Sequence, residues 1–279
     1  MLIGLAWIAA LVLVVLTLYG ALVEAWRFQL TRVELRLERW PAALDGLTIL
    51  HLSDLHCRRG QRVEQHLAGL YARLPEPDLV VFTGDFCEGD RPIARCAAAL
   101  APLRGRLGTF AVLGNNDCHA AAHTAALAQA LDSAGIELLR DEARRLTDRD
   151  ASFALGGLDW VTLRRHDKSY RLPVEPTFAD CGDLPRILLA HSPDAMPEAV
   201  EAGVDLLLCG HTHGGQICLP GGRALHNNLY RFGPPAYTRG LYREGRTTLL
   251  VSAGLGMTWP CVRLWCPPEA LQITLRSAN

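Results

Sequence analysis

Five short, mostly apolar segments in this chain each end at side chains that can bind a metal ion. The segments are rich in Val, Ile and Leu and cover residues 47–53, 79–83, 110–113, 186–190 and 204–209. Such runs are typical of strands that are buried on both faces of a sheet. Stretches of helical character separate them, at residues 63–74, 93–103, 120–134 and 195–202. This alternation predicts an α/β fold with largely parallel strands and right-handed crossovers.

The polar side chains that follow the five segments are Asp, Asn and His residues. They are Asp54, His56, Asp85, Asn115, Asn116, Asp117, His191, His211 and His213. Because ligands bind beyond the carboxyl ends of the strands in such sheets, we expect one shared site. Each piece alone also has a structural interpretation, since a lone His is usually a hydrogen-bonded core residue and a Gly-Asp pair is usually a turn. The combination of oxygen and imidazole ligands without a thiolate suits Mn, Fe or Zn.

The order of these residues resembles the calcineurin-like metallophosphoesterase superfamily over about residues 47–275. The motifs that carry the resemblance are Asp54-x-His56, Gly84-Asp85, Gly114-Asn115, His191 and Gly210-His211-Thr212-His213. Later segments are similar to the membrane-anchored or exported bacterial branch, namely Gly214–Ile217, Val251–Gly256, Pro260, Arg263 and Pro268-Glu269. The resemblance implies the metallophosphoesterase fold, an α/β fold in which two mixed β-sheets are sandwiched between helices.

The resemblance also implies two divalent metal ions, with Mn favoured over Fe or Zn. The first ion would be bound by Asp54, His56 and His213, the second by Asn115, His191 and His211, with Asp85 bridging both. Two such ions polarise a phosphoryl group and activate a water molecule as hydroxide, so no Ser or Cys nucleophile is needed. Because Asp85 would contact both ions, its loss should reduce activity most.

The chain departs from the family pattern directly after Gly114-Asn115. Most members carry a His there, which is thought to protonate the leaving group, whereas this chain has Asn116 followed by Asp117. An Asn side chain donates a hydrogen bond but cannot deliver a proton at neutral pH. Either His119, His123 or another His takes that role, or the leaving group needs no proton. The candidate catalytic residues are therefore Asp85, Asn116, Asp117 and His119.

The missing His favours an activated substrate. General acid catalysis contributes about 10²–10⁴-fold, which matters for an alkoxide leaving group but little for a phosphate, already a stable anion. UDP-2,3-diacylglucosamine pyrophosphatases of the same superfamily also lack this His, so we expect hydrolysis of UDP-2,3-diacylglucosamine to lipid X and UMP in lipid A synthesis. The alternatives are a membrane-tethered phosphodiesterase of unknown substrate and a catalytically silent metal-binding scaffold. A net charge of −1 without a basic track disfavours nucleic acid as a partner.

The N-terminal residues predict one transmembrane helix. Leu2–Val23 contains no charged side chain, and its 22 residues would form a helix of about 33 Å, enough to cross a hydrocarbon core of roughly 30 Å. A signal peptide cleaved near residues 23–25 is the alternative, although no basic residue precedes the span. Basic side chains follow the span, at Arg27, Arg32, Arg36 and Arg39. By the positive-inside rule, the rest of the chain lies in the cytoplasm.

We therefore expect a single-pass protein of the bacterial inner membrane with a cytoplasmic catalytic domain. Nine cysteines without a CxxC pair also favour a reducing compartment.

The chain is expected to divide into three parts. These are an anchor at 1–27, a linker or edge segment at 28–46 that fits either an edge strand or a surface helix, and a catalytic domain at 47–279. The expected partners are the membrane and a phosphate-containing, lipid-linked small molecule, while the oligomeric state stays open. A basic cluster at 164–171 is either a phosphate-binding lip or a solvated loop.

Overall fold

The computed structural model describes residues 2–58, 63–72, 74–160, 171–227, 229 and 236–278. The helices are α1 (Leu2–Leu22), α2 (Val63–Tyr71), α3 (Ile93–Leu100), α4 (Ala121–Ser133), α6 (Val174–Thr177) and α7 (Met196–Glu201). The strands are β1 (Gln29–Leu37), β2 (Thr48–Leu52), β3 (Leu79–Thr83), β4 (Thr109–Val112), β5 (Glu137–Leu138), β6 (Glu142–Asp148), β7 (Ala151–Gly157), β8 (Arg186–Leu189), β9 (Leu206–Cys209), β10 (Gly240–Glu244), β11 (Thr247–Val251) and β12 (Glu269–Ser277). Most of the basic cluster at 164–171 lies outside the described residues, and Arg171 forms an ion pair with Glu201 at 2.6 Å between Nη1 and Oε2.

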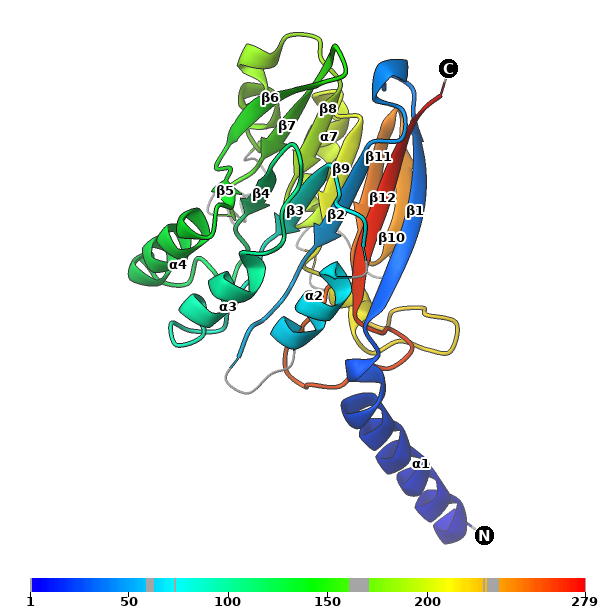
Figure 1. Ribbon diagram of the computed structural model, residues 1–279. Helices are drawn as coiled ribbons and strands as arrows, with labels where there is room; N and C mark the ends of the chain where they lie inside the picture. The colour runs from blue at the N-terminus through cyan, green and yellow to red at the C-terminus, as the bar shows by residue number, and fades with distance from the viewer. Residues whose placement is uncertain are drawn as a thin grey trace.

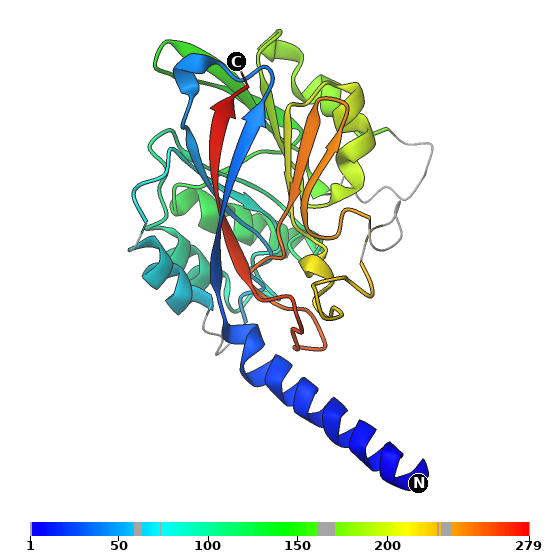
Figure 2. The ribbon, with the colours of Figure 1, turned by 90° about the vertical axis from the view of Figure 1, so that its right-hand side faces the viewer.

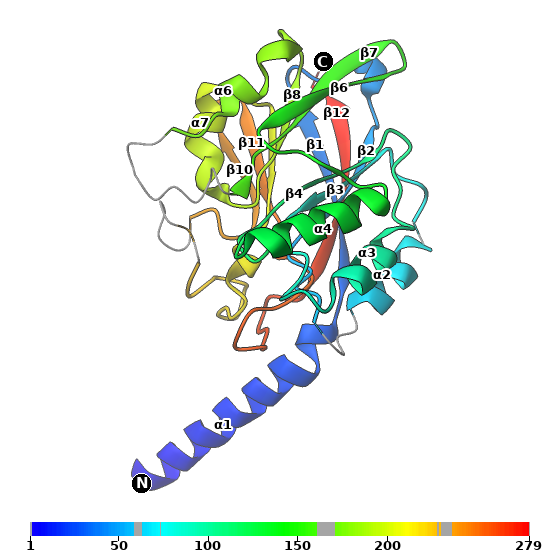
Figure 3. The ribbon, with the colours of Figure 1, turned by 90° about the vertical axis from the view of Figure 1, so that its left-hand side faces the viewer.

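The strands form two six-stranded sheets that pack face to face (Figure 1). The first sheet has the order β1-β12-β2-β3-β4-β5, and the second has the order β10-β11-β9-β8-β7-β6. Parallel pairing dominates both, but the β12/β2, β10/β11 and β6/β7 pairs are antiparallel. Helices α2, α3 and α4 cover the outer face of the first sheet, and α6 and α7 lie on the second (Figures 2 and 3). The predicted fold of two mixed sheets between helices is confirmed.

Consecutive side chains of the central strands lie in two different cores. In β3, Leu79 and Val81 pack between the two sheets, whereas Val80 and Phe82 pack in the cluster that includes residues of α2, α3 and α4. Side chains alternate along a strand, so a strand with a core on each side needs an unbroken apolar run. This explains why the five predicted segments correspond to β2, β3, β4, β8 and β9.

The segment 28–46 contains an edge strand rather than a surface helix. Gln29–Leu37 forms β1, which pairs in parallel with β12 from Gln29 opposite Glu269 to Leu37 opposite Ser277. Leu35 and Leu37 are buried in the core between the sheets. β1 is therefore a strand of the first sheet, and the expected division of the chain at residue 46 stays a prediction.

Helix α1 projects away from the two sheets (Figure 2). Ile3–Trp26 is long and apolar enough to cross a membrane, and an 18-residue stretch within it has a mean hydropathy of 2.5, with 6% of that stretch buried. The end of this segment is nevertheless attached to the domain. The backbone N–H of Arg263 donates to the carbonyl of Gly20 at 3.3 Å, and that of Cys266 donates to Glu24 Oε1 at 2.8 Å. The candidate membrane span therefore ends against the segment that precedes β12.

Candidate metal centre

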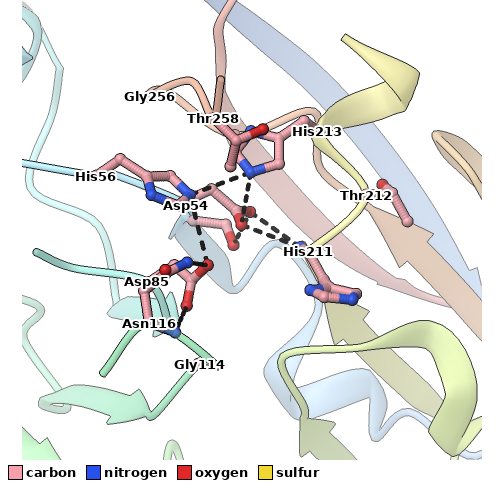
Figure 4. Close-up of polar contacts among 12 residues, drawn as sticks. Asp54, His56, Asp85, Gly114, Asn116, His211, Thr212, His213, Gly256 and Thr258 are labelled. Carbon is pink, nitrogen blue, oxygen red and sulfur yellow. Dashed lines mark hydrogen bonds and ion pairs between the residues drawn. The ribbon is translucent and has the colours of Figure 1, made fainter. Parts of the chain in front are cut away.

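The predicted metal ligands lie in five loops at one end of the two sheets. Asp54 and His56 follow β2, Asp85 follows β3, Asn115 follows β4, His191 follows β8, and His211 and His213 follow β9. Figure 4 shows the side chains of Asp54, His56, Asp85, His211 and His213 close together. The Asp and His residues are each at most 5% exposed, and Asn115 is half-buried. Both sheets therefore contribute to one buried polar cluster.

Asp54, His56 and His213 form the first group. Nε2 of His56 lies 3.1 Å from Nε2 of His213, which in turn lies 3.6 Å from Oδ1 of Asp54. The other ring nitrogen of His56, Nδ1, lies 3.1 Å from Oε1 of Glu88. Glu88 accepts a hydrogen bond from Nδ1–H of His56, which leaves the Nε2 electron pair of the neutral ring facing the group.

Asp85, Asn115, His191 and His211 form the second group. Nε2 of His191 lies 3.1 Å from Oδ1 of Asn115 and 3.1 Å from Nδ1 of His211. Nδ1 of His191 donates to the backbone carbonyl of Thr83 at 2.6 Å. That bond fixes the ring orientation and leaves the Nε2 electron pair directed at Asn115 and Asp85.

Asp85 lies between the two groups. Its Oδ2 is 3.4 Å from Nε2 of His56 and 3.5 Å from Nε2 of His191. One carboxylate oxygen is thus within reach of both groups, which is the arrangement expected of a ligand shared by two ions. The structure supports the predicted bridging role of Asp85, and that role stays a prediction.

The electrostatics of the cluster fit divalent metal ions. Burial lowers the pKa of His213 well below its usual value, so this imidazole is neutral, and burial raises the pKa of Asp54. Nδ1 of His213 is buried and has no hydrogen-bond partner among the described residues. Carboxylates and imidazoles converge here: ligand atoms of Asp54, His56 and His213 lie within 4.8 Å of one another, as do those of Asp54, Asp85 and His191. Such mixed oxygen and nitrogen sets suit Mn, Fe or Zn.

Asn116 contacts the carboxylate of Asp85 through both its backbone and its side chain. Its backbone N–H donates to Oδ1 of Asp85 at 2.8 Å, and its Nδ2 donates to Oδ2 at 2.6 Å. Both oxygens of the proposed bridging carboxylate are therefore bound to one residue. These contacts make Asn116 a residue that positions Asp85, and the catalytic role predicted for Asn116 stays a prediction.

Asp117 also contacts the loop of Asp85 rather than the open side of the cluster. Its carboxylate is fully buried and accepts backbone N–H bonds from Asp85 at 2.7 Å, Phe86 at 2.9 Å and Gly114 at 2.9 Å. Burial and the charge of Asp85 raise the pKa of Asp117 to about 7, and the backbone donors oppose that shift. These contacts fasten the loops after β3 and β4 together, and the catalytic role predicted for Asp117 stays a prediction.

His119 lies at the surface next to this loop. Its Nδ1 is 2.6 Å from the carbonyl of Asn116, and its ring packs on that of His123 with centroids 4.4 Å apart. His123 in turn is 2.6 Å from Asp90 through its Nδ1. The two histidines thus form a pair at the start of α4, and a catalytic role for His119 stays a prediction.

The backbone at five of the ligands has an unusual conformation. Positive φ angles occur at Asp54 (51°), His56 (43°), Asp85 (56°), His211 (69°) and His213 (51°). Residues with a Cβ rarely adopt this region, and such strain gathers at functional sites where the surrounding structure imposes it. Close approach also requires glycine at position 114, because a Cβ there would collide with the carboxylate of Asp85.

Two residues that support the cluster had no role predicted from the sequence. Glu88 orients His56 and also pairs with the guanidinium of Arg58. Although burial raises the pKa of Glu88, the hydrogen bonds from His56 and Arg58 outweigh it and hold this pKa below its usual value. Arg263 is fully buried and donates to the carbonyls of Ala253 at 2.8 Å and Gly256 at 2.6 Å. Glu88 lies three residues after Asp85, and this position could have indicated its role beside the metal ligands. Nothing local in the sequence indicates the buried contacts of Arg263.

A cavity of about 340 Å³ opens beside His213. Its walls include polar side chains from the loop after β9 and residues of a later loop, namely Thr212, Gln216, Asn227, Thr258 and Trp259. The cavity is large enough for part of a small-molecule substrate next to the first group of ligands.

Comparisons with known proteins give a consistent result. A family model described as calcineurin-like phosphoesterase matches residues 47–215. The chain is 32% identical to a transmembrane protein with metallophosphoesterase domain from Bos taurus, covering 97% of this chain and 62% of that protein, so it spans less than two thirds of that relative. It is 31% identical to the uncharacterized metallophosphoesterase YkuE of Bacillus subtilis, covering 94% and 90% of the two chains. It is 28% identical to the UDP-2,3-diacylglucosamine pyrophosphatase LpxG of Chlamydia muridarum, covering 86% and 87%.

The contact between Glu88 and His56 gives a testable prediction for metal affinity. Replacing Glu88 by Gln removes the carboxylate that orients His56, so we expect metal affinity to fall about 10–100-fold, as for other residues that support metal-bound imidazoles. Titration of chelator-treated protein with Mn²⁺ measures this. Glu142→Gln, which changes a partly exposed side chain on β6, is the matched control. Equal affinities for the two variants would show that Glu88 does not support a metal ligand.

Proposed function

Because the chain belongs to the calcineurin-like phosphoesterase family, and is therefore a metallophosphoesterase, we propose that it hydrolyses a phosphoanhydride in a lipid-linked substrate. The observation that carries this proposal is the side chain of Asn116. Its Nδ2 donates to Oδ2 of Asp85 at 2.6 Å, and an amide cannot act as a general acid. A leaving group that departs as a phosphate needs none, whereas an alkoxide does.

The chain's own residues would hold two divalent ions in the order that the sequence suggested. The first set is Asp54, His56 and His213, the second is Asn115, His191 and His211, and Asp85 lies between them. When bound, such ions supply Lewis-acid activation of the phosphoryl group and of the attacking water. Asn116 and Asp117 keep the Asp85 carboxylate in place, directly and through the backbone. We favour Mn as the native metal.

The substrate that we propose is UDP-2,3-diacylglucosamine, which hydrolysis at the pyrophosphate converts to lipid X and UMP. The relative LpxG, at 28% identity, is named for this pyrophosphatase activity. The candidate membrane span suits an acylated substrate, since the acyl chains lie in a bilayer. We further propose an anchor at 1–27, a linker or edge segment at 28–46 and a catalytic domain at 47–279 on the cytoplasmic side of the inner membrane. The basic residues that follow the span, such as Arg27 and Arg32, support this orientation.

Release of UMP tests the proposed substrate. Detergent-solubilised protein with Mn²⁺ should release UMP from UDP-2,3-diacylglucosamine, and Asp85→Ala should abolish release because the shared carboxylate is lost. Asp132→Ala, an exposed position in α4, is the matched control and should retain activity. Hydrolysis of an aryl phosphodiester without UMP release would favour a phosphodiesterase of different substrate. Failure with both substrates in metal-loaded protein would favour a silent scaffold.

Variants of Asn116 test the leaving-group argument. Asn116→Ala removes a hydrogen bond to a buried carboxylate, which is worth about 10–100-fold in kcat/KM if Asp85 loses its orientation. Asn116→His supplies a proton donor, and we expect it to give no increase in anhydride hydrolysis. Rates of UMP release from each variant decide the matter. A large gain for Asn116→His would contradict the view that the leaving group needs no proton.

A further inference from the structure

Exposed apolar side chains gather on two loops of the domain. Outside the 3–23 segment, the large apolar residues that are exposed among the described residues are Leu219, Leu225, Leu241, Trp259 and Trp265. Four of these five lie in segments 217–225 and 257–266, which we name the docking loops. Trp259 is 87% exposed, the largest value of the set. An exposed apolar group of this kind marks an interaction surface.

The docking loops are joined to each other. The backbone N–H of Cys218 donates to the carbonyl of Leu264 at 2.9 Å, and that of Leu264 donates to Gln216 at 3.0 Å. The side chain of Gln216 adds further bonds, because its Nε2 donates to the carbonyls of Thr258 at 3.1 Å and Pro260 at 2.7 Å. The two loops therefore form one surface rather than two independent segments.

The same surface contacts the last turn of α1. Arg263 bonds to Gly20, and a Cβ added to Gly20 would lie 2.6 Å from Cγ1 of Val262 and 3.1 Å from Cδ2 of Leu264. Gly20 is two residues before the end of α1 at Leu22, a rise of about 3 Å along the helix axis. Figure 2 shows both loops, in yellow and orange-red, at the end of the domain from which α1 leaves. The docking loops therefore lie beside the C-terminal end of the candidate membrane span.

We propose that the docking loops insert into the leaflet that contains the C-terminal end of α1, so that the cavity beside His213 opens onto the bilayer. Tryptophan is favoured at the boundary between headgroups and hydrocarbon, where an apolar ring and a polar N–H are both satisfied. Arg223, exposed between Leu219 and Leu225, can pair with anionic headgroups. Direct continuity with a candidate membrane span favours lipid over a protein partner as the occupant.

The cavity connects this surface to the metal centre. Leu225 and Trp259, on the two docking loops, line it together with His213. A substrate with its phosphate near His213 can therefore keep an apolar tail against Trp259 and in the bilayer. This part of the inference rests on the proposed phosphohydrolase function and specifies its substrate class: a phosphate-bearing amphiphile taken from the membrane.

Fluorescence of the full-length protein in vesicles tests docking without relying on activity. The chain is reconstituted into phosphatidylethanolamine and phosphatidylglycerol, with or without brominated lipid, and compared with Trp259→Phe. We expect Trp259 to contribute emission that brominated lipid quenches and aqueous iodide does not. Trp40→Phe is the control, because Trp40 is 2% exposed and lies between the sheets. Quenching of Trp259 by iodide would overturn the proposal, and so would protection from both quenchers, which would indicate that protein rather than lipid covers the ring.

A second experiment tests the supply of substrate from the bilayer. Leu219→Glu places a charge on a docking loop away from the cavity, and Leu241→Glu is the matched exposed control on β10. We expect Leu219→Glu to lower the turnover of vesicle-embedded UDP-2,3-diacylglucosamine about tenfold relative to a soluble aryl phosphodiester, with no change for Leu241→Glu. Equal ratios in both variants would overturn the proposed substrate route. Inactivity of the unchanged protein on both substrates would instead contradict the proposed function, while the fluorescence result would still decide docking.

Discussion

Burying the carboxylates of Asp54 and Asp85 together costs free energy, and the surrounding structure has to offset that cost. Each carboxylate is desolvated, and the charge of Asp85 raises the pKa of Asp54 further. Backbone and side-chain donors offset part of this cost, including the N–H of His211 at 3.0 Å from Asp54 and that of Asn116 at 2.8 Å from Asp85. Paired or metal-bound charges are the usual solution for buried carboxylates. Two divalent ions held by the surrounding imidazoles would complete it, and the left-handed backbone at the ligands follows from bringing these groups so close.

Five strands that have an apolar core on each face were predictable from the sequence, whereas β7 and β11, which also contribute to both cores, were not predicted. β2, β3, β8 and β9 stand out because every side chain in such a strand is buried or nearly so. β1 shows partial exposure at most positions, and its partner β12 lies about 240 residues away, so neither pattern nor proximity decided between a strand and a helix. β6 and β10 were not predicted for the same reason, since their side chains are largely exposed or intermediate.

The place of the ligands was predictable as well, whereas the direction of the neighbouring side chains was not. Strand ends in an α/β sheet converge, so Asp85 and His191 could be expected in one site. Nothing in the sequence shows that Asn116 turns toward Asp85, or that the carboxylate of Asp117 bonds three backbone N–H groups. These are tertiary contacts, and a position next to a ligand is compatible with catalysis and with support alike.

Arg263 links the candidate membrane span to the metal centre. Its backbone contacts Gly20 in α1, and its buried guanidinium binds the carbonyls of the 253–256 loop. That loop in turn bonds to the segment of Asp54, where the N–H of Leu255 donates to the carbonyl of Ser53 at 3.0 Å.

Metal content measured by inductively coupled plasma mass spectrometry tests the metal centre most directly. Protein purified without chelator and then incubated with Mn²⁺ should hold two divalent ions per chain, and a content of one ion or none would contradict the account.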